Sequence, residues 1–147
     1  MRSPNREQLV HEFHEAMSVY GENYLRTLES RMRLMSEEFH EVKTDMAAIM
    51  VDLHRGKAPS VEKLSALLKE LCDLQYVLSG TADELGWTPI FDAAFRRVHA
   101  SNMSKLDDNG DPVKDPATGK VLKGENYKQA DLTDLVKDTA IAAGEAL

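Results

Sequence analysis

Residues 28–53 read LESRMRLMSEEFHEVKTDMAAIMVDL, and this stretch decides the fold class. Its apolar residues recur at steps of three and four, which places them on one stripe of an α-helix. The stripe consists of Leu28, Met35, Phe39, Val42, Met46, Ile49 and Leu53. The pattern predicts one long helix from about residue 23 to residue 54, ended by Gly56 and Pro59. A long helix with a single apolar stripe is typical of a helical bundle.

The flanking segments repeat the helical pattern. A short helix is predicted to begin near Pro4 and to reach about Val19. Ser60 is a suitable N-cap for a leucine-rich helix that ends near Gly86. We expect a fourth helix at 88–105, with Thr88 as its cap and Pro89 at its first position.

The helical periodicity of the sequence ends after Lys105. Residues 107–122 are rich in turn-forming residues, with short apolar tips at Val113 and Val121 that predict a small hairpin or an ordered loop. Residues 131–142 predict a last short helix. We therefore expect an all-α fold, with a four-helix-bundle-like core in residues 1–106. Residues 107–147 would form a C-terminal hairpin or loop and a short helix within the same domain.

Composition narrows the class of protein. The 147 residues are 42% hydrophobic and 29% charged, as in soluble globular domains, and no run reaches transmembrane length. The formal net charge of −7 argues against binding to nucleic-acid phosphates. The single cysteine, Cys72, excludes an internal disulfide, and its apolar surroundings in LLKELCDL predict a buried, inert thiol. We expect a cytoplasmic protein that does not bind membranes or nucleic acid.

Three acids of the long helix, Glu37, Glu38 and Glu41, lie on one arc of its surface. Like charges so close together repel one another and cost the helix stability. Because the apolar stripe lies roughly opposite Glu37, periodicity alone favours a solvated acidic face.

A second pair of acids changes this interpretation. Glu70 and Asp73 are three residues apart on the next helix, and their neighbours on that face are apolar or small. A carboxylate on such a face is partly desolvated, which is costly unless a cation or hydrogen bonds compensate; a salt bridge from Lys63 or Lys69 is the simpler alternative. Five carboxylates on two adjacent helices suit Mg²⁺ or Mn²⁺, whereas the histidines and the lone cysteine show no zinc pattern.

The pattern E-E-x-x-E followed by E-x-x-D is present as Glu37-Glu38-x-x-Glu41 and Glu70-x-x-Asp73, separated by residues 42–69. It resembles the signature of the all-α nucleoside triphosphate pyrophosphohydrolases, a MazG-like group that includes dimeric dUTPases and phosphoribosyl-ATP pyrophosphohydrolase. The resemblance covers about residues 7–105. It implies attack of water at a phosphoanhydride of a nucleoside triphosphate, dependent on Mg²⁺, with release of nucleoside monophosphate and pyrophosphate.

The resemblance also implies roles for the acids. Glu37, Glu41, Glu70 and Asp73 would bind the metal, and Glu38 would be the base that deprotonates the water. Bundles of this family usually pair, so the resemblance implies a homodimer or a dimer of dimers.

Substrate contacts are predicted at the end of the fourth helix and after it. Asn102 and Lys105 lie on one face and would bind a sugar hydroxyl or base edge and a phosphate; an ordinary polar helix terminus is the alternative. Lys120, Lys123 and Tyr127 would fold over the phosphates as a lid, or else belong to a solvated loop.

Two other functions remain open at the level of sequence. One is a non-catalytic helical interaction module whose acids only keep it soluble or bind a basic partner. The other is the same chemistry on phosphoribosyl-ATP, although the extension after Lys105 has no counterpart that we can place in that smaller enzyme.

Overall fold

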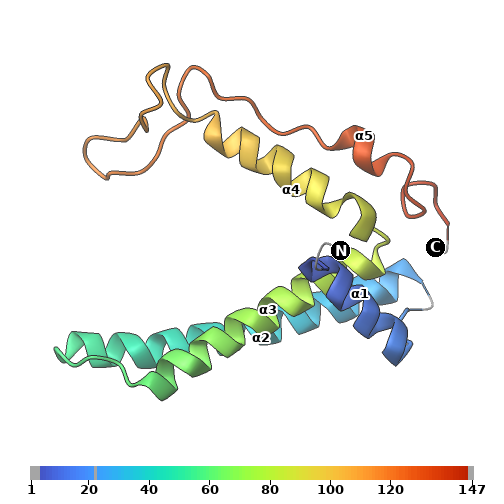
Figure 1. Cartoon of the computed structure of the whole chain (residues 1–147), viewed down its shortest axis with the longest axis horizontal. Coiled ribbons are helices and arrows are strands. Elements are labelled where there is room, and N and C mark those ends of the chain that lie inside the picture. Colours follow the sequence, from blue (N-terminus) through green and yellow to red (C-terminus); the bar gives the residue numbers. More distant parts are fainter. Residues whose placement is uncertain (1–3, 22, 146–147) are drawn as a thin grey trace.

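The computed structural model describes residues 4–21 and 23–145 (Figure 1). The predicted all-α fold is confirmed, since the described residues form four long helices that pack together, one short helix and no strand. The elements are α1 (Arg6–Met17), α2 (Tyr24–His54), α3 (Val61–Glu84), α4 (Thr88–Met103) and α5 (Thr133–Val136).

Helices α2 and α3 form an antiparallel hairpin and make the largest helix contact of the molecule (Figure 1). Both begin at caps that satisfy a free backbone N–H. The side chain of Asn23 accepts a hydrogen bond from the backbone N–H of Arg26 at 3.0 Å. The side chain of Ser60, the cap predicted from sequence, accepts one from the backbone N–H of Lys63 at 3.3 Å. The hairpin fixes which faces of the two helices meet.

Helix α1 packs on α3, near the end of the hairpin where a polar cluster lies (Figure 1). We define this polar cluster as His11, His14, Arg31, Asp83 and Glu84. The Asp83 carboxylate binds Nδ1 of His11 at 2.7 Å and Nδ1 of His14 at 2.8 Å. Arg31 donates to Nε2 of His14 at 2.9 Å and pairs with Glu84. Because Arg31 can only donate, His14 carries its proton on Nδ1 and donates it to Asp83.

The backbone leaves room for this cluster at Gly80. A β-carbon there would lie 2.9 Å from a guanidinium nitrogen of Arg31 and 2.9 Å from Cε1 of His14. Burial raises the pKa of Asp83, but hydrogen bonds from Thr88, His14 and His11 outweigh it, so the net pKa is lowered. The cluster therefore ties α1, α2 and α3 together through an ionised carboxylate.

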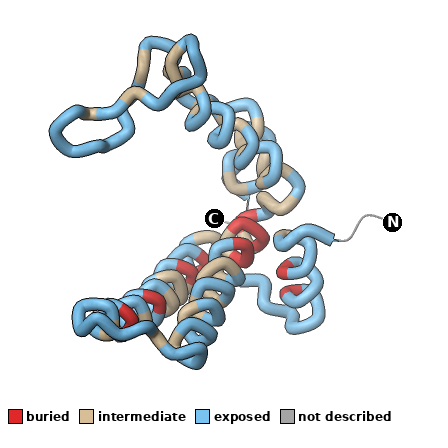
Figure 2. The backbone as a smooth tube through the Cα atoms, turned by 60° about the vertical axis from the view of Figure 1, so that its left-hand side comes forward, coloured by how far each residue is buried: buried red, intermediate tan, exposed pale blue. Residues whose placement is uncertain are grey.

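Helix α4 begins one residue earlier than predicted. Trp87 is its N-cap residue, without a side-chain cap, and Thr88 is the first helical residue. The prediction that Thr88 caps the helix is wrong, because its hydroxyl donates to Asp83 at 2.8 Å instead. Only the region around this start contacts α1 and α3, and the rest of α4 points away from the hairpin (Figures 1 and 2).

The segment after α4 has the predicted small hairpin in reduced form. Two isolated bridges, Leu106 to Pro112 and Lys114 to Val121, replace regular strands. The chain then returns beside α4 (Figure 1), where Arg97 binds the carboxylate of Asp134. The predicted last helix is confirmed only as the four-residue α5.

The buried core is small and lies in α1, α2, α3 and the turn after α3 (Figure 2). Its apolar members are Val10, Val42, Ile49, Ala82 and Leu85. Only two residues of the predicted α2 stripe are buried, and four others are exposed, namely Leu28, Phe39, Met46 and Leu53. The prediction of a buried Cys72 is also wrong, because this thiol is exposed. No helix in the described ranges has the length and apolar character needed to cross a membrane.

Candidate metal centre on helices α2 and α3

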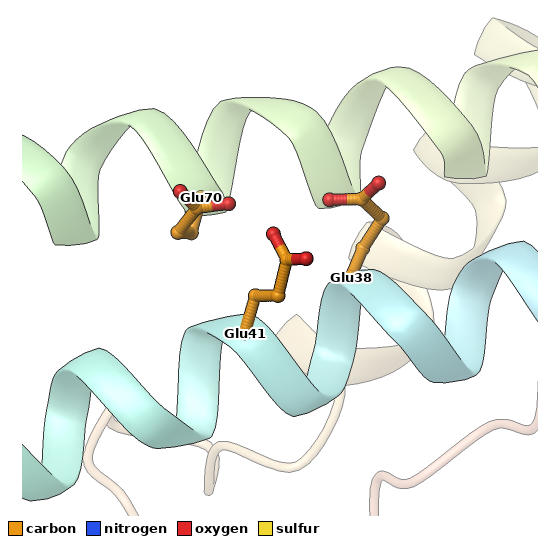
Figure 3. Close-up of side chains that lie close together, drawn as sticks. All are labelled: Glu38, Glu41 and Glu70. Atoms are coloured by element: carbon orange, nitrogen blue, oxygen red, sulfur yellow. The ribbon is translucent and has the colours of Figure 1, made fainter.

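Three of the five predicted acids come together where α2 faces α3. Glu38 and Glu41 project from α2 and Glu70 from α3, and their carboxylates turn toward one another (Figure 3). One carboxylate oxygen of each lies within 4.8 Å of those of the other two. We call these residues the carboxylate triad. Glu38 and Glu41 share a face because they are three residues apart, and the antiparallel packing brings Glu70 across from them.

Glu70 is strongly desolvated. Its side chain is only 13% exposed. Its Oε2 is buried and has no hydrogen-bond partner in the described part of the chain. An ionised oxygen in this position lacks both water and a donor, which is unfavourable. The desolvation that the sequence predicts for this position is therefore confirmed.

The proximity of the three acids shifts the pKa of Glu41. In its protonated form Glu41 can donate a hydrogen bond to Glu70, which raises the pKa of Glu41, and the charges of Glu70 and Glu38 raise it further. Lys69 acts in the opposite direction. Because the net pKa of Glu41 is raised, the charge of Lys69 does not fully offset the repulsion between the three acids when all are ionised.

Lys69 bridges the two predicted acids of α3. Its ammonium donates to Oε1 of Glu70 at 3.0 Å and to Oδ2 of Asp73 at 2.6 Å. These contacts raise the pKa of Lys69, with the Asp73 hydrogen bond contributing most. Lys69 therefore makes the salt bridge that the sequence offered as an alternative to a metal, but it contacts only one of the two oxygens of Glu70.

The other two predicted ligands lie outside the triad. Asp73 is on the same face of α3 as Glu70, and its side chain is 40% exposed and paired with Lys69. Glu37 is exposed on α2. The geometry therefore groups Glu38, rather than Glu37, with Glu41 and Glu70.

The donor set of the triad fits a hard divalent cation. All three donors are carboxylate oxygens, and one of them is a buried oxygen without a partner. Mg²⁺ and Mn²⁺ prefer such oxygen ligands. Of the residues that the structure describes, no histidine or cysteine joins a group of three ligand atoms that all lie within 4.8 Å of one another.

The predicted substrate contacts lie elsewhere in the chain. Asn102 accepts a hydrogen bond from the Lys105 ammonium at 2.8 Å at the exposed end of α4. In the following loop the Lys123 ammonium lies 4.5 Å from the centre of the Tyr127 ring, and Lys120 is exposed nearby. Both views place this end of α4 and its loop away from the α2–α3 hairpin (Figures 1 and 2). Two pairs of predicted substrate-binding residues thus contact each other, Asn102 with Lys105 and Lys123 with Tyr127, but none of them lies near the triad of the same chain.

The polar cluster is the main feature that the sequence did not indicate. His11 and Asp83 are 72 positions apart, and their spacing matches no motif. The only available signal was a histidine pair on a short helix, which is also compatible with a solvated face.

No protein-family model matches the sequence, and no curated protein matches it either. The resemblance to the all-α pyrophosphohydrolases therefore depends on the acidic pattern and on the helical fold that carries it.

Proposed function

We propose that the protein is a Mg²⁺-dependent pyrophosphohydrolase of nucleoside or deoxynucleoside triphosphates. The observation that carries the proposal is the convergence of Glu38, Glu41 and Glu70 around the unpartnered Oε2 of Glu70. A cation between three carboxylates so close together would offset their repulsion, and phosphoanhydride hydrolysis is the chemistry of the family that the acidic pattern resembles.

In the proposed mechanism each carboxylate of the triad has a role. Glu41 and Glu70 would hold the cation from opposite helices. When bound, Mg²⁺ would supply positive charge against the negative charge of the phosphates, both before and during hydrolysis. Glu38, whose carboxylate lies within 4.8 Å of both ligands, accepts the proton of the attacking water.

The substrate contacts are proposed to come from a second copy of the chain. Asn102 and Lys105 would bind the sugar or base and a phosphate, and Lys120, Lys123 and Tyr127 would close over the phosphates. Because these residues lie away from the triad in one chain, a neighbouring copy is the source that would complete the site. The proposal therefore includes a homodimer or a dimer of dimers as the active form.

The exposed surface supports this assembly. The chain has an accessible area of 10953 Å². A compact monomer of this mass exposes about 7,600 Å². The excess is several times the roughly 800 Å² that each partner buries in a standard protein interface. Much of it is apolar, since the leucine stripe of α3 (Leu64, Leu68 and Leu71) is exposed, with Leu68 at 63%.

The decisive experiment is a test of pyrophosphate release from a panel of nucleoside and deoxynucleoside triphosphates and phosphoribosyl-ATP, with and without Mg²⁺. We expect Mg²⁺-dependent release by the wild type and a loss of at least about a hundredfold in Glu38→Gln. Glu29→Gln is the matched control, because it makes the same chemical change at an exposed position of α2. Its activity should equal that of the wild type.

Absence of turnover for every substrate would refute the proposed activity. If Mg²⁺ also failed to change the melting temperature, the acids would be a solvated face and the chain a non-catalytic helical interaction module. Activity of Glu38→Gln equal to that of Glu29→Gln would refute the role of Glu38 alone.

A further inference from the structure

Lys69 is placed so that one ammonium holds both acids of the E-x-x-D pair. It lies 3.0 Å from Glu70 Oε1 and 2.6 Å from Asp73 Oδ2. Its own side chain is 66% exposed. A lysine this exposed can leave its partners and become hydrated at little cost, because surface ion pairs contribute little net stability.

The contact with Lys69 also accounts for the position of Asp73. Glu70 and Asp73 are three residues apart on α3, so both can reach the same ligand. Yet Asp73 lies outside the triad, and its Oδ2 binds Lys69 instead. Glu70 uses one oxygen for the same ammonium, while its second oxygen is buried without a partner. Lys69 therefore draws Asp73 to itself and leaves the triad incompletely neutralised.

We propose that Lys69 is a displaceable counter-ion that exchanges places with a divalent cation. In the exchange the ammonium moves into solvent, and Asp73 turns to join Glu41 and Glu70 as a third ligand, while Glu38 stays beside the cation as the base. Lys69 is thus a positioning residue that sets the divalent-cation concentration at which the site fills. This inference rests on the proposed function, because it assumes that the triad binds a cation.

The exchange has a simple electrostatic basis. Lys69 provides a single positive charge from outside the triad, whereas a divalent cation provides two charges between the carboxylates. A monovalent cation gains too little to displace the lysine. A divalent cation gains contacts with Glu41, Glu70 and Asp73 and the attraction of the nearby Glu38 charge, so occupancy should depend on the charge of the ion more than on total ionic strength.

The test measures binding of Mg²⁺ and Mn²⁺ by isothermal titration calorimetry in the wild type, Lys69→Met and Lys43→Met. Lys43→Met removes the same charge from an exposed position two residues from Glu41, where the ammonium lies over the Phe39 ring. It therefore controls for the general loss of a positive charge. We expect Lys69→Met to bind Mg²⁺ about tenfold more tightly than Lys43→Met.

A double variant isolates the role of Asp73. If Lys69 acts by retaining Asp73, the gain from Lys69→Met should fall by more than half in an Asp73→Asn background. Equal gains in both backgrounds would overturn the exchange of Asp73. Far-ultraviolet circular dichroism checks that each variant keeps its helices, as expected for substitutions at exposed positions.

The outcomes separate this inference from the proposed function. If the wild type and Lys69→Met both fail to bind any divalent cation, the proposed metal centre fails, and the inference fails with it. If the wild type binds Mg²⁺ but Lys69→Met and Lys43→Met have the same affinity, only the role of Lys69 is overturned.

Discussion

At the scale of single residues, Glu41 is the member of the carboxylate triad whose pKa the other two acids raise. The hydrogen bond that its protonated form can donate to Glu70, and then the charges of Glu70 and Glu38, raise the pKa of Glu41. A carboxyl whose pKa is higher in the folded state stabilises the fold at low pH. That stability is lost as the pH rises through the raised folded pKa. At neutral pH without divalent cations, the ionised form of Glu41 therefore opposes folding.

The first prediction follows for Glu41→Gln. In the absence of divalent cations this variant should have a higher melting temperature than the wild type at pH 7, with the difference disappearing below about pH 4. Adding Mg²⁺ should raise the melting temperature of the wild type much more than that of the variant. Thermal melts across pH, with Glu29→Gln as the control, measure both effects. A lower melting temperature for Glu41→Gln at pH 7 without Mg²⁺ would contradict the prediction.

The pKa of a second residue, Asp83, is shifted in the opposite direction. Although burial raises the pKa of Asp83, the hydrogen bonds from Thr88, His14 and His11 give it a net pKa below the ordinary value. A carboxylate of this kind contributes stability above its unfolded pKa, and the contribution is lost as the pH falls through the folded pKa. Its side chain is only 3% exposed and that of its partner His14 only 4%, so His14 cannot turn to water when the carboxylate is removed.

The second prediction is that Asp83→Asn lowers the free energy of unfolding by about 3 kcal/mol at pH 7. The difference in free energy from the wild type should narrow as the pH falls below about 4 toward the lowered pKa of folded Asp83, where the wild-type carboxylate becomes protonated. Urea denaturation at pH 7 and at a series of pH values below about 4 measures this difference. Asp92→Asn is the control, because Asp92 pairs only on the surface with Arg96, and its loss should change stability by less than about 0.5 kcal/mol. A constant difference at all pH values would show that the charge of Asp83 contributes nothing.

At the scale of elements, the sequence predicted what depends on neighbours in the chain. The caps Asn23 and Ser60 act on N–H groups three residues away, so the starts of α2 and α3 were predictable to within a residue. Thr88 has the chemistry of a cap but donates to Asp83, a partner that only the fold supplies. The last helix was overestimated because its pattern is helical while its packing surface is small.

In the candidate site, too, the sequence predicted what depends on spacing along the chain but not what depends on packing between helices. Spacing along the chain predicts that Glu38 and Glu41 share a face and that Glu70 and Asp73 share another. It does not predict which face of α2 meets α3, so the sequence alone did not favour Glu38 over Glu37. It also did not show that Lys69 would hold Asp73 outside the triad, because the rotation of a long side chain depends on nearby charges.

The third prediction concerns the segment that returns along α4. Arg97 binds the Asp134 carboxylate and donates to the Asp131 carbonyl oxygen at 3.0 Å. Arg97→Ala should release the segment, so that trypsin cleaves after Lys128 and Lys137 at least about threefold faster, while the urea midpoint is nearly unchanged.

Arg96→Ala is the matched control for this element. Arg96 is the adjacent residue of α4 and pairs with Asp92 one turn earlier on the same helix. Its removal should leave the cleavage rate of the C-terminal segment as in the wild type. Equal rates in the two variants would mean that Arg97 does not hold the segment in place.

At the scale of the whole molecule, the small core and the large exposed apolar surface are two aspects of one property. The spacing of apolar residues at steps of three and four predicted which face of a helix is apolar, but it does not predict what packs against that face. In α2 and α3 the apolar stripes extend well beyond the contact between the two helices, and Leu68 and Phe39 are 63% and 53% exposed. Helix α4 adds Phe95 at 66%. Monomeric proteins rarely leave so much apolar surface in contact with water.

The fourth prediction is that the protein in solution has a mass of at least twice 16.5 kDa, measured by light scattering after size-exclusion chromatography. Leu68→Glu should shift the mass toward the monomer, because a buried interface would not accommodate an unpaired charge. Thr44→Glu is the control, because it adds the same charge at an exposed position of α2. Thr44 is two residues from the buried Val42, which places it about 160° around the helix and away from the core.

The two variants distinguish the loss of an interface between copies from the general effect of adding a charge to the surface. If a second copy covers the leucine stripe, Leu68→Glu should reduce the measured mass and make the unfolding midpoint independent of protein concentration, while Thr44→Glu keeps both as in the wild type. If the chain is a monomer, a substitution at an exposed leucine should change stability by no more than about 0.5 kcal/mol and leave the mass at 16.5 kDa. A monomeric wild type would overturn the proposed assembly, and pyrophosphate release by that monomer would show that one chain completes the site by itself.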